Sequence, residues 1–251
     1  ILKAETRIGL LDLLNVLSET CYRMVPVAGA CAAAGLVIGG ITMTGLAGKF
    51  AHLVYGITEA QMLPTLALTA VVTIVLGMGM PTPSAYILAA ALMTPILAKL
   101  GIPTMGAHMF VLYYAVMSAL TPPVAVAAYA ASSIAEDNPL YIALLAVKFA
   151  LAAFIIPFAF VYGPELLMNG APSEILFSLV TAISGLIFIA AAVEGYLTEP
   201  LSVIIRLIMA AGGLALVAPN IVAAAIGVPL VAIALGPAAY RKFISRPSNP
   251  S

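Results

Sequence analysis

Two short interruptions in the apolar sequence carry the residue types best suited to bind a small cation or a carboxylate. Residues 77–84 read Gly-Met-Gly-Met-Pro-Thr-Pro-Ser, and residues 118–123 read Ser-Ala-Leu-Thr-Pro-Pro. Glycine and proline break helices, so backbone carbonyls lose their helical partners beside hydroxyl groups. Unwound carbonyls at membrane depth are the groups that coordinate Na⁺ in secondary transporters. The two interruptions together are therefore the candidate site.

The first interruption brings a helix C-terminus and a helix N-terminus to one point. The C-terminus offers carbonyls to a cation, and the N-terminus offers N–H groups to a carboxylate. The predicted site residues are Gly77, Met78, Gly79, Pro81, Thr82, Ser84, Ser118, Thr121 and Pro122, with Gly77, Ser118 and Thr121 as the Na⁺ ligands. The alternatives are a plain surface loop at the first interruption and a packing kink at the second. The loop alternative is disfavoured because residues 77–84 carry no charge and include two methionines.

The amino-acid composition indicates the class of protein to which this candidate site belongs. Hydrophobic residues make up 63% of the 251 residues and charged residues 8%, with ten Lys and Arg against ten Asp and Glu. Soluble domains are about 45–50% apolar and about 25% charged. The composition excludes a soluble enzyme, a disordered chain and a disulfide-rich secreted domain, and a zero net charge favours no nucleic-acid partner. We expect an all-α polytopic membrane protein.

The charges divide the chain into predicted helices. No charge lies between Glu59 and Lys99, a stretch too long for one straight helix across roughly 30 Å of hydrocarbon. We expect two arms, about 61–76 and 85–98, joined at the first interruption as two spans or as one re-entrant hairpin over 61–98. The next stretch predicts a broken helix over 107–134. The other predicted crossings are 24–56, 139–163, 175–197, 201–217 and 221–236. With the hairpin, six crossings agree with basic residues at both ends, which place both ends in the cytoplasm.

Other polar and small residues have simpler interpretations. Lys148 is predicted to extend to the cytoplasmic interface, and His108 is predicted to be a surface residue. Gly35 and Gly39 predict close helix packing. Metalloprotease, serine-hydrolase and P-loop motifs are absent from the sequence, so we expect no enzyme and no cofactor.

The two interruptions also resemble those of a known family. The run GMGMPTPSAYILAAALMTPILAKLGI, followed by SALTPPVAVAAYAASSIA, is similar to the second half of the large membrane subunit of TRAP (tripartite ATP-independent periplasmic) transporters. Gly77, Met78, Ala85 and either Pro81 or Pro83 match the hairpin tip approximately, and 120–124 matches the break closely. The resemblance covers roughly residues 10–168. From Ser173 onward the chain resembles, by length and position, the extra membrane region of fused permeases of the TAXI type.

This resemblance implies an elevator-type carrier built from two inverted repeats. Residues 1–170 would be the second repeat, and residues 171–251 additional transmembrane helices. The first repeat is expected upstream, so that this chain is a C-terminal half with half of a site. The implied protein lies in the bacterial inner membrane and uses the Na⁺ gradient to take up organic acids. Its implied partners are a TAXI-type periplasmic binding protein and a small membrane subunit, fused or separate.

Two other functions remain open from the residues. The first is a related dicarboxylate/Na⁺ symporter that needs no binding protein. The second is a membrane scaffold that transports nothing, which would tolerate helix-forming substitutions at Gly77 and Pro122.

Overall fold

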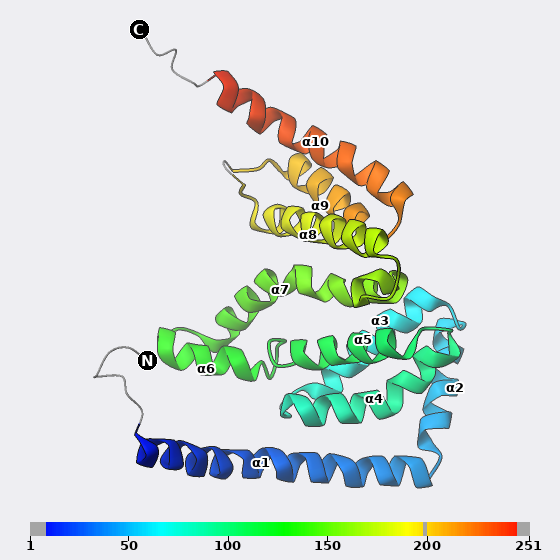
Figure 1. Cartoon of the computed structure of the whole chain (residues 1–251), viewed down its shortest axis with the longest axis vertical. Helices are drawn as coiled ribbons and strands as arrows, with labels where there is room; N and C mark the ends of the chain where they lie inside the picture. The colour runs from blue at the N-terminus through cyan, green and yellow to red at the C-terminus, as the bar shows by residue number, and fades with distance from the viewer. Residues whose placement is uncertain (1–8, 198–199, 245–251) are drawn as a thin grey trace.

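The helices of the described residues are arranged in three groups. The computed structural model describes residues 9–197 and 200–244, with side chains described as far as Leu235. The helices are α1 (Leu10–Met43), α2 (Leu46–Thr58), α3 (Met62–Gly77), α4 (Thr82–Lys99), α5 (Thr104–Met117), α6 (Val126–Ala135), α7 (Pro139–Tyr162), the 3₁₀ helix η2 (Pro164–Leu167), α8 (Pro172–Glu194), α9 (Val203–Val217) and α10 (Ile221–Ile244). As Figure 1 shows, α1 lies along one edge, α2–α7 form the middle, and α8–α10 stack at the opposite edge. The described ranges contain no β-strand.

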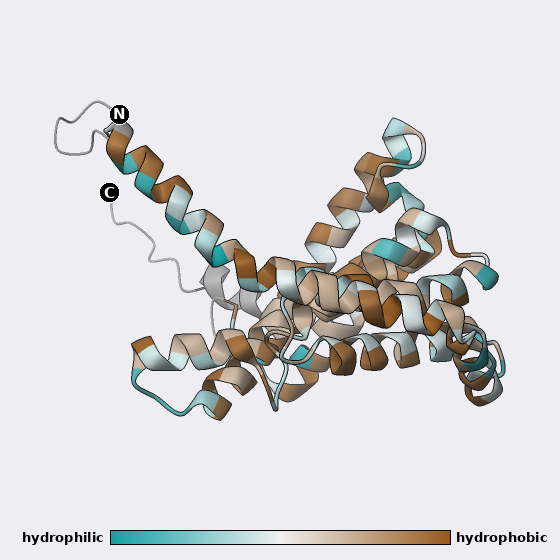
Figure 2. Ribbon diagram, turned by 90° about the horizontal axis from the view of Figure 1, so that it is seen from below, coloured by the Kyte–Doolittle hydropathy of each residue, from teal (hydrophilic) through white to brown (hydrophobic). Residues whose placement is uncertain are grey.

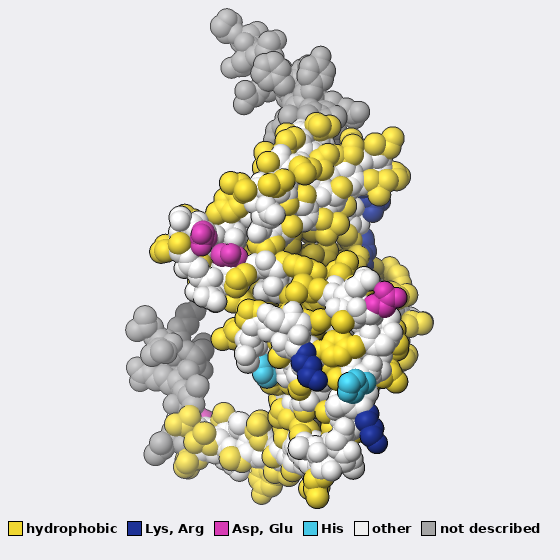
Figure 3. All heavy atoms as spheres, turned by 90° about the vertical axis from the view of Figure 1, so that its right-hand side faces the viewer, with side chains coloured by type: hydrophobic (Ala, Val, Ile, Leu, Met, Phe, Trp, Pro, Cys, Tyr) yellow, Lys and Arg dark blue, Asp and Glu magenta, His cyan; other side chains and the backbone are white. Residues whose placement is uncertain are grey.

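The helices have the lengths and composition of membrane spans. Over the described residues, three helices are long and apolar enough to cross a membrane, namely Leu11–Met43, Pro139–Tyr162 and Pro172–Glu194. Several shorter apolar helices accompany them. Hydrophilic residues gather at helix ends and loops (Figure 2), and hydrophobic side chains cover most of the face in Figure 3. The prediction of an all-α polytopic membrane protein is confirmed.

The first predicted crossing, 24–56, is divided between two helices. Helix α1 begins at Leu10 and continues through the charged residues Glu19 and Arg23, which pair one turn apart at 2.8 Å. With 34 residues, α1 is about 51 Å long. The chain turns at Gly45, which has a φ of +66°, a conformation that glycine adopts without steric cost. The charge pattern predicted a single crossing over 24–56 because the positions of the charged residues give no indication of a turn at Gly45.

The charge-free stretch after α2 forms a helical hairpin. Helix α3 has 16 residues and α4 has 18, and they correspond to the predicted arms at 61–76 and 85–98. Both arms pack against α5, and this core includes the fully buried Leu66, Met93 and Phe110. Helix α7 covers the other side of α5, where the Tyr114 hydroxyl donates a hydrogen bond of 2.6 Å to the Phe154 carbonyl. The core therefore holds the hairpin and α5 together, whereas α6 packs against α7.

Helices α8–α10 pack through glycines at their crossing points. A Cβ atom on Gly213 would lie 2.8 Å from the Gly185 carbonyl oxygen, and one on Gly227 would lie 2.9 Å from the Gly212 carbonyl oxygen. Such distances bring the backbones of neighbouring helices into direct contact, which only small residues permit. Helix α8 contacts α9 much more extensively than it contacts α7. The three helices are thus a closely packed unit beside the core.

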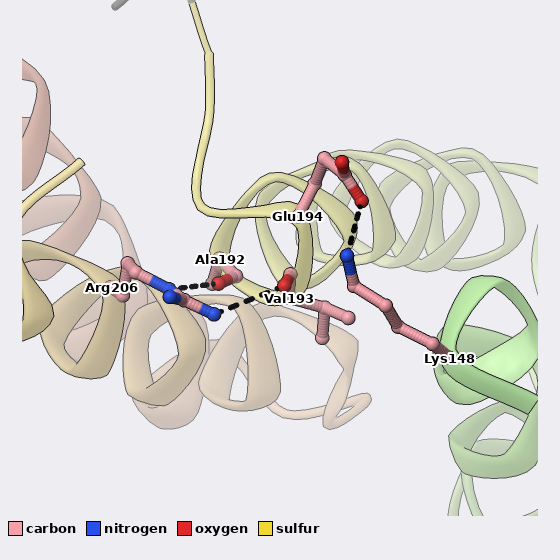
Figure 4. A network of polar contacts seen from close by, with 5 residues as sticks. All are labelled: Lys148, Ala192, Val193, Glu194 and Arg206. Atoms are coloured by element: carbon pink, nitrogen blue, oxygen red, sulfur yellow. Dashed lines mark hydrogen bonds and ion pairs between the residues drawn. The ribbon is translucent and has the colours of Figure 1, made fainter. Parts of the chain in front are cut away.

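Polar side chains join this unit together and connect it to α7 (Figure 4). Arg206 of α9 donates from Nε to the Ala192 carbonyl at 2.8 Å and from Nη2 to the Val193 carbonyl at 3.1 Å. The guanidinium thus satisfies two carbonyls at the end of α8, where the helix dipole favours a positive charge. Lys148 Nζ of α7 lies 2.9 Å from Glu194 Oε2. Lys148 therefore pairs with a carboxylate on α8, a contact that its sequence position did not predict.

Candidate functional site

The tip of the hairpin and the break after α5 are in direct contact. A Cβ atom built on Gly77 would lie 2.8 Å from the Cβ atom of Ser118 and 3.3 Å from that of Ala85, and it would overlap the Ser118 hydroxyl. Carbon atoms in good contact are about 3.5–4.0 Å apart. Only glycine therefore fits at the end of α3, and the absence of its side chain brings the α3 backbone against Ser118.

The turn between the two arms adds a second contact with the break. The Met80 N–H donates to the Gly77 carbonyl at 3.2 Å, and Gly79 has a φ of +80°. This conformation favours glycine and lets the chain reverse in few residues. A Cβ atom on Gly79 would lie 3.6 Å from Val124 Cγ1, an ordinary van der Waals distance. The turn thus lies over the segment that follows the two prolines.

The break itself is produced by Pro122 and Pro123, which are joined by a cis peptide bond. Pro122 has no N–H to donate to the Ser118 carbonyl four residues earlier, so this carbonyl loses its helical partner. The carbonyl of Ala119 instead accepts a hydrogen bond of 3.1 Å from the Ala127 N–H, at the start of α6. The break therefore frees the carbonyl of Ser118, the residue whose side chain lies against Gly77.

The two predicted hydroxyl ligands of the break keep their oxygens available. Ser118 Oγ donates to the Ala115 carbonyl at 2.7 Å, and Thr121 Oγ1 donates to the Met117 carbonyl at 2.8 Å. A hydroxyl that donates its proton retains two lone pairs that can accept or coordinate. Residues 77–85 and 118–125 contain no charged side chain. The contact therefore offers neutral oxygens, an environment that suits a monovalent cation.

The other predicted site residues are distributed around the turn. Pro81 is the N-cap of α4 and is exposed, whereas Met78, Thr82, Thr121 and Pro122 are half-buried. The hydroxyl of Ser84 is buried and donates to the sulfur of Cys31 on α1 at 3.5 Å. The structure thus brings Gly77 and Ser118 together directly, and it directs the Ser84 hydroxyl to α1 instead.

Two features of this region were not predicted from the sequence. The Tyr86 hydroxyl and His108 Nδ1 form a hydrogen bond of 2.8 Å between α4 and α5, so the half-buried His108 has a partner on the neighbouring helix. Thr65, Thr69 and Thr73 are fully buried on α3 and lead towards Gly77. A threonine at every fourth position of an otherwise apolar helix was the sequence signal that could have revealed this line.

Comparison with known proteins identifies the family. Residues 1–174 match the family described as the tripartite ATP-independent periplasmic transporter, DctM component. Searches of curated proteins and of solved structures found no match for the chain. The family match covers more than half of the chain and includes the hairpin and the broken helix. The chain therefore belongs to the DctM family and is a membrane permease component of a tripartite transporter.

Proposed function

We propose that the chain is the permease of a Na⁺-coupled secondary transporter that takes up organic acids delivered by a periplasmic binding protein. The observation that carries this proposal is the contact between the end of α3 at Gly77 and the end of α5 at Ser118. Two broken elements that meet with carbonyl and hydroxyl oxygens are the arrangement in which secondary transporters bind their coupling ions. Thr121 supplies a further hydroxyl close to this contact.

A cation and a carboxylate have separate places at this contact. The carbonyl end of α3 carries the negative end of its helix dipole and suits Na⁺, with Gly77, Ser118 and Thr121 as ligands. The N-terminus of α4, which begins at Thr82, carries the positive end and suits a carboxylate. No arginine lies within residues 77–85 or 118–125. We therefore propose that a second hairpin and a second broken helix, from another part of the assembled transporter, supply the remaining contacts.

The partners and location follow the same proposal. Residues 1–170 form one repeat of an inverted-repeat elevator, and residues 171–251 are additional membrane helices. A binding protein of the TAXI type delivers the substrate, and a small membrane subunit, fused or separate, completes the permease. The location is the bacterial inner membrane. What supports this part is the family match over residues 1–174 and the apolar helices beyond it.

The test measures the thermal stability of the purified transporter in NaCl and in KCl at equal ionic strength. We expect Na⁺, but not K⁺, to raise the unfolding temperature, because only the ion that binds the folded state stabilises it. Thr121→Ala removes one ligand and should weaken this response. Equal responses to Na⁺ and K⁺ in the unmodified transporter refute Na⁺ coupling and favour the scaffold. An unchanged Na⁺ response in Thr121→Ala refutes the ligand assignment.

A second experiment separates the transport alternatives. Uptake of radiolabelled organic acids into proteoliposomes is measured under an inward Na⁺ gradient, with and without the binding protein. We expect uptake only when both are present. Uptake that needs Na⁺ but not the binding protein would instead identify the dicarboxylate type of symporter.

A further inference from the structure

Hydroxyl side chains form a buried line along one face of α3. Thr65, Thr69 and Thr73 are each 0% exposed, and Gly77 follows one turn after Thr73. Residues four apart lie on the same face of a helix, one turn above the other. The face that holds Gly77 meets Ser118 of α5. The line of threonines therefore ends at the contact between the hairpin tip and the break.

The other end of the line reaches an exposed, charged turn. Thr65 Oγ1 lies 2.9 Å from Thr58 Oγ1 and donates to the Gln61 carbonyl at 2.7 Å. Gln61 is exposed, and its amide donates to the Glu59 carboxylate at 3.3 Å. Both Glu59 and Gln61 lie in the turn between α2 and α3. A carboxylate at this turn raises the local concentration of cations.

The two hydroxyls in the middle and at the upper end of the line, on Thr69 and Thr73, lack hydrogen-bond partners in the observed packing of the described residues. Thr69 Oγ1 and Thr73 Oγ1 have no hydrogen-bond partner among the described residues, whereas Thr65 has two. A buried hydroxyl without a partner loses its hydrogen bonds to water and gains nothing in return. The observed packing of α3 against α4 and α5 therefore carries a free-energy cost for burying the Thr69 and Thr73 hydroxyls without partners. A state in which water or a cation reaches them removes this penalty.

We propose that Thr65, Thr69 and Thr73 line the route by which the coupling cation moves between the turn at Glu59 and the site at Gly77 and Ser118. This inference rests on the proposed Na⁺ coupling. Successive hydroxyls lie about 6 Å apart along the helix, and each replaces part of the hydration shell of a cation that passes. The route is closed in the observed packing, since all three threonines are fully buried, and it opens when α3 separates from its neighbours.

The test compares the kinetics and the equilibrium of Na⁺ binding in the assembled transporter. The chain contains no tryptophan, so Met80→Trp in the half-buried turn gives a single reporter in this chain. In this background, Thr69→Val and Thr73→Val together remove both hydroxyls and keep the side-chain shape. We expect Na⁺ association and dissociation to slow by about tenfold or more, with the dissociation constant within about twofold, because only the barrier changes.

Two matched variants control for other effects. Thr69→Ser with Thr73→Ser keeps the hydroxyls and should bind and release Na⁺ as fast as the reporter protein. Thr94→Val removes a hydroxyl of α4 that does not belong to the line and already donates to the Ala90 carbonyl, and it should also leave the rates unchanged. A slow serine variant would show that packing, and not the hydroxyls, sets the rate, and it would overturn the proposal.

The outcomes separate the route from the proposed function. Unchanged rates in the valine variant, with a normal Na⁺ response in the unmodified transporter, refute the route alone. A dissociation constant that rises as much as the rate falls makes the threonines ligands and also refutes the route. A transporter without any Na⁺ response refutes the proposed function and the route with it.

Discussion

Substitution of Gly77 by alanine tests the contact on which the site depends. The new Cβ atom would lie 2.8 Å from Ser118 Cβ, so the two backbones must separate by about 0.7 Å or more to reach a normal contact. Overpacking of this kind costs about 1–3 kcal/mol, against a helix preference for alanine over glycine of about 0.5–1 kcal/mol. At roughly 2–4 °C per kcal/mol, we expect the unfolding temperature to fall by a few degrees and the Na⁺ response to be lost.

Companion variants identify the cause of that loss. In the Gly77→Ala background, Ser118→Gly removes the obstructing Cβ atom of residue 118 and should recover most of the lost stability. In the same background, Ser118→Ala keeps that Cβ atom and should not recover it. Gly35→Ala on α1 is the matched control, because nothing lies within 4 Å of its Cβ position. Thermal unfolding in detergent measures all four variants. If Gly77→Ala were as stable as Gly35→Ala, the close approach of tip and break would be wrong.

Three further predictions concern the α8–α10 unit and its ion pair with α7. Gly213→Ala places a Cβ atom 2.8 Å from the Gly185 carbonyl and should cost about 1–3 kcal/mol in thermal unfolding, whereas Gly56→Ala meets nothing within 4 Å and should cost nothing. Arg206→Lys loses the fork that reaches two carbonyls, so amide exchange at the end of α8 should accelerate while exchange in α3 stays unchanged. Lys148→Met removes an ion pair that is partly exposed, and thermal unfolding should register about 1 kcal/mol or less.

Local breaks in the helices were predictable from the sequence because their causes are local. Glycine and proline act on their own turn of helix, so the ends of α3 at Gly77 and of α5 at Met117 follow from residues within a few positions. The turn at Gly45 was missed because a single glycine in an apolar run also occurs within continuous helices.

Contacts between distant residues were predictable only where a chemical reason linked them. The pairing of the two breaks was expected from their shared polar groups, and Gly77 does meet Ser118. The ion pair of Lys148 with Glu194 depends on the register of α7 against α8, which no local pattern encodes. Gly35 and Gly39 predicted close packing, yet nothing described lies within 4 Å of their Cβ positions. Small residues indicate that another helix can approach closely, but they do not indicate which helix does so.

The glycine crossings of α8–α10 make this unit largely independent of the rest of the chain in its packing. The family match ends at residue 174, within the first turn of α8. The three helices beyond it bury their surfaces chiefly against one another, and few contacts connect them to α7. A segment that packs chiefly against itself covers little of the core of α3–α5. The joint before α8 is therefore the place where the chain could be shortened with least damage to that core.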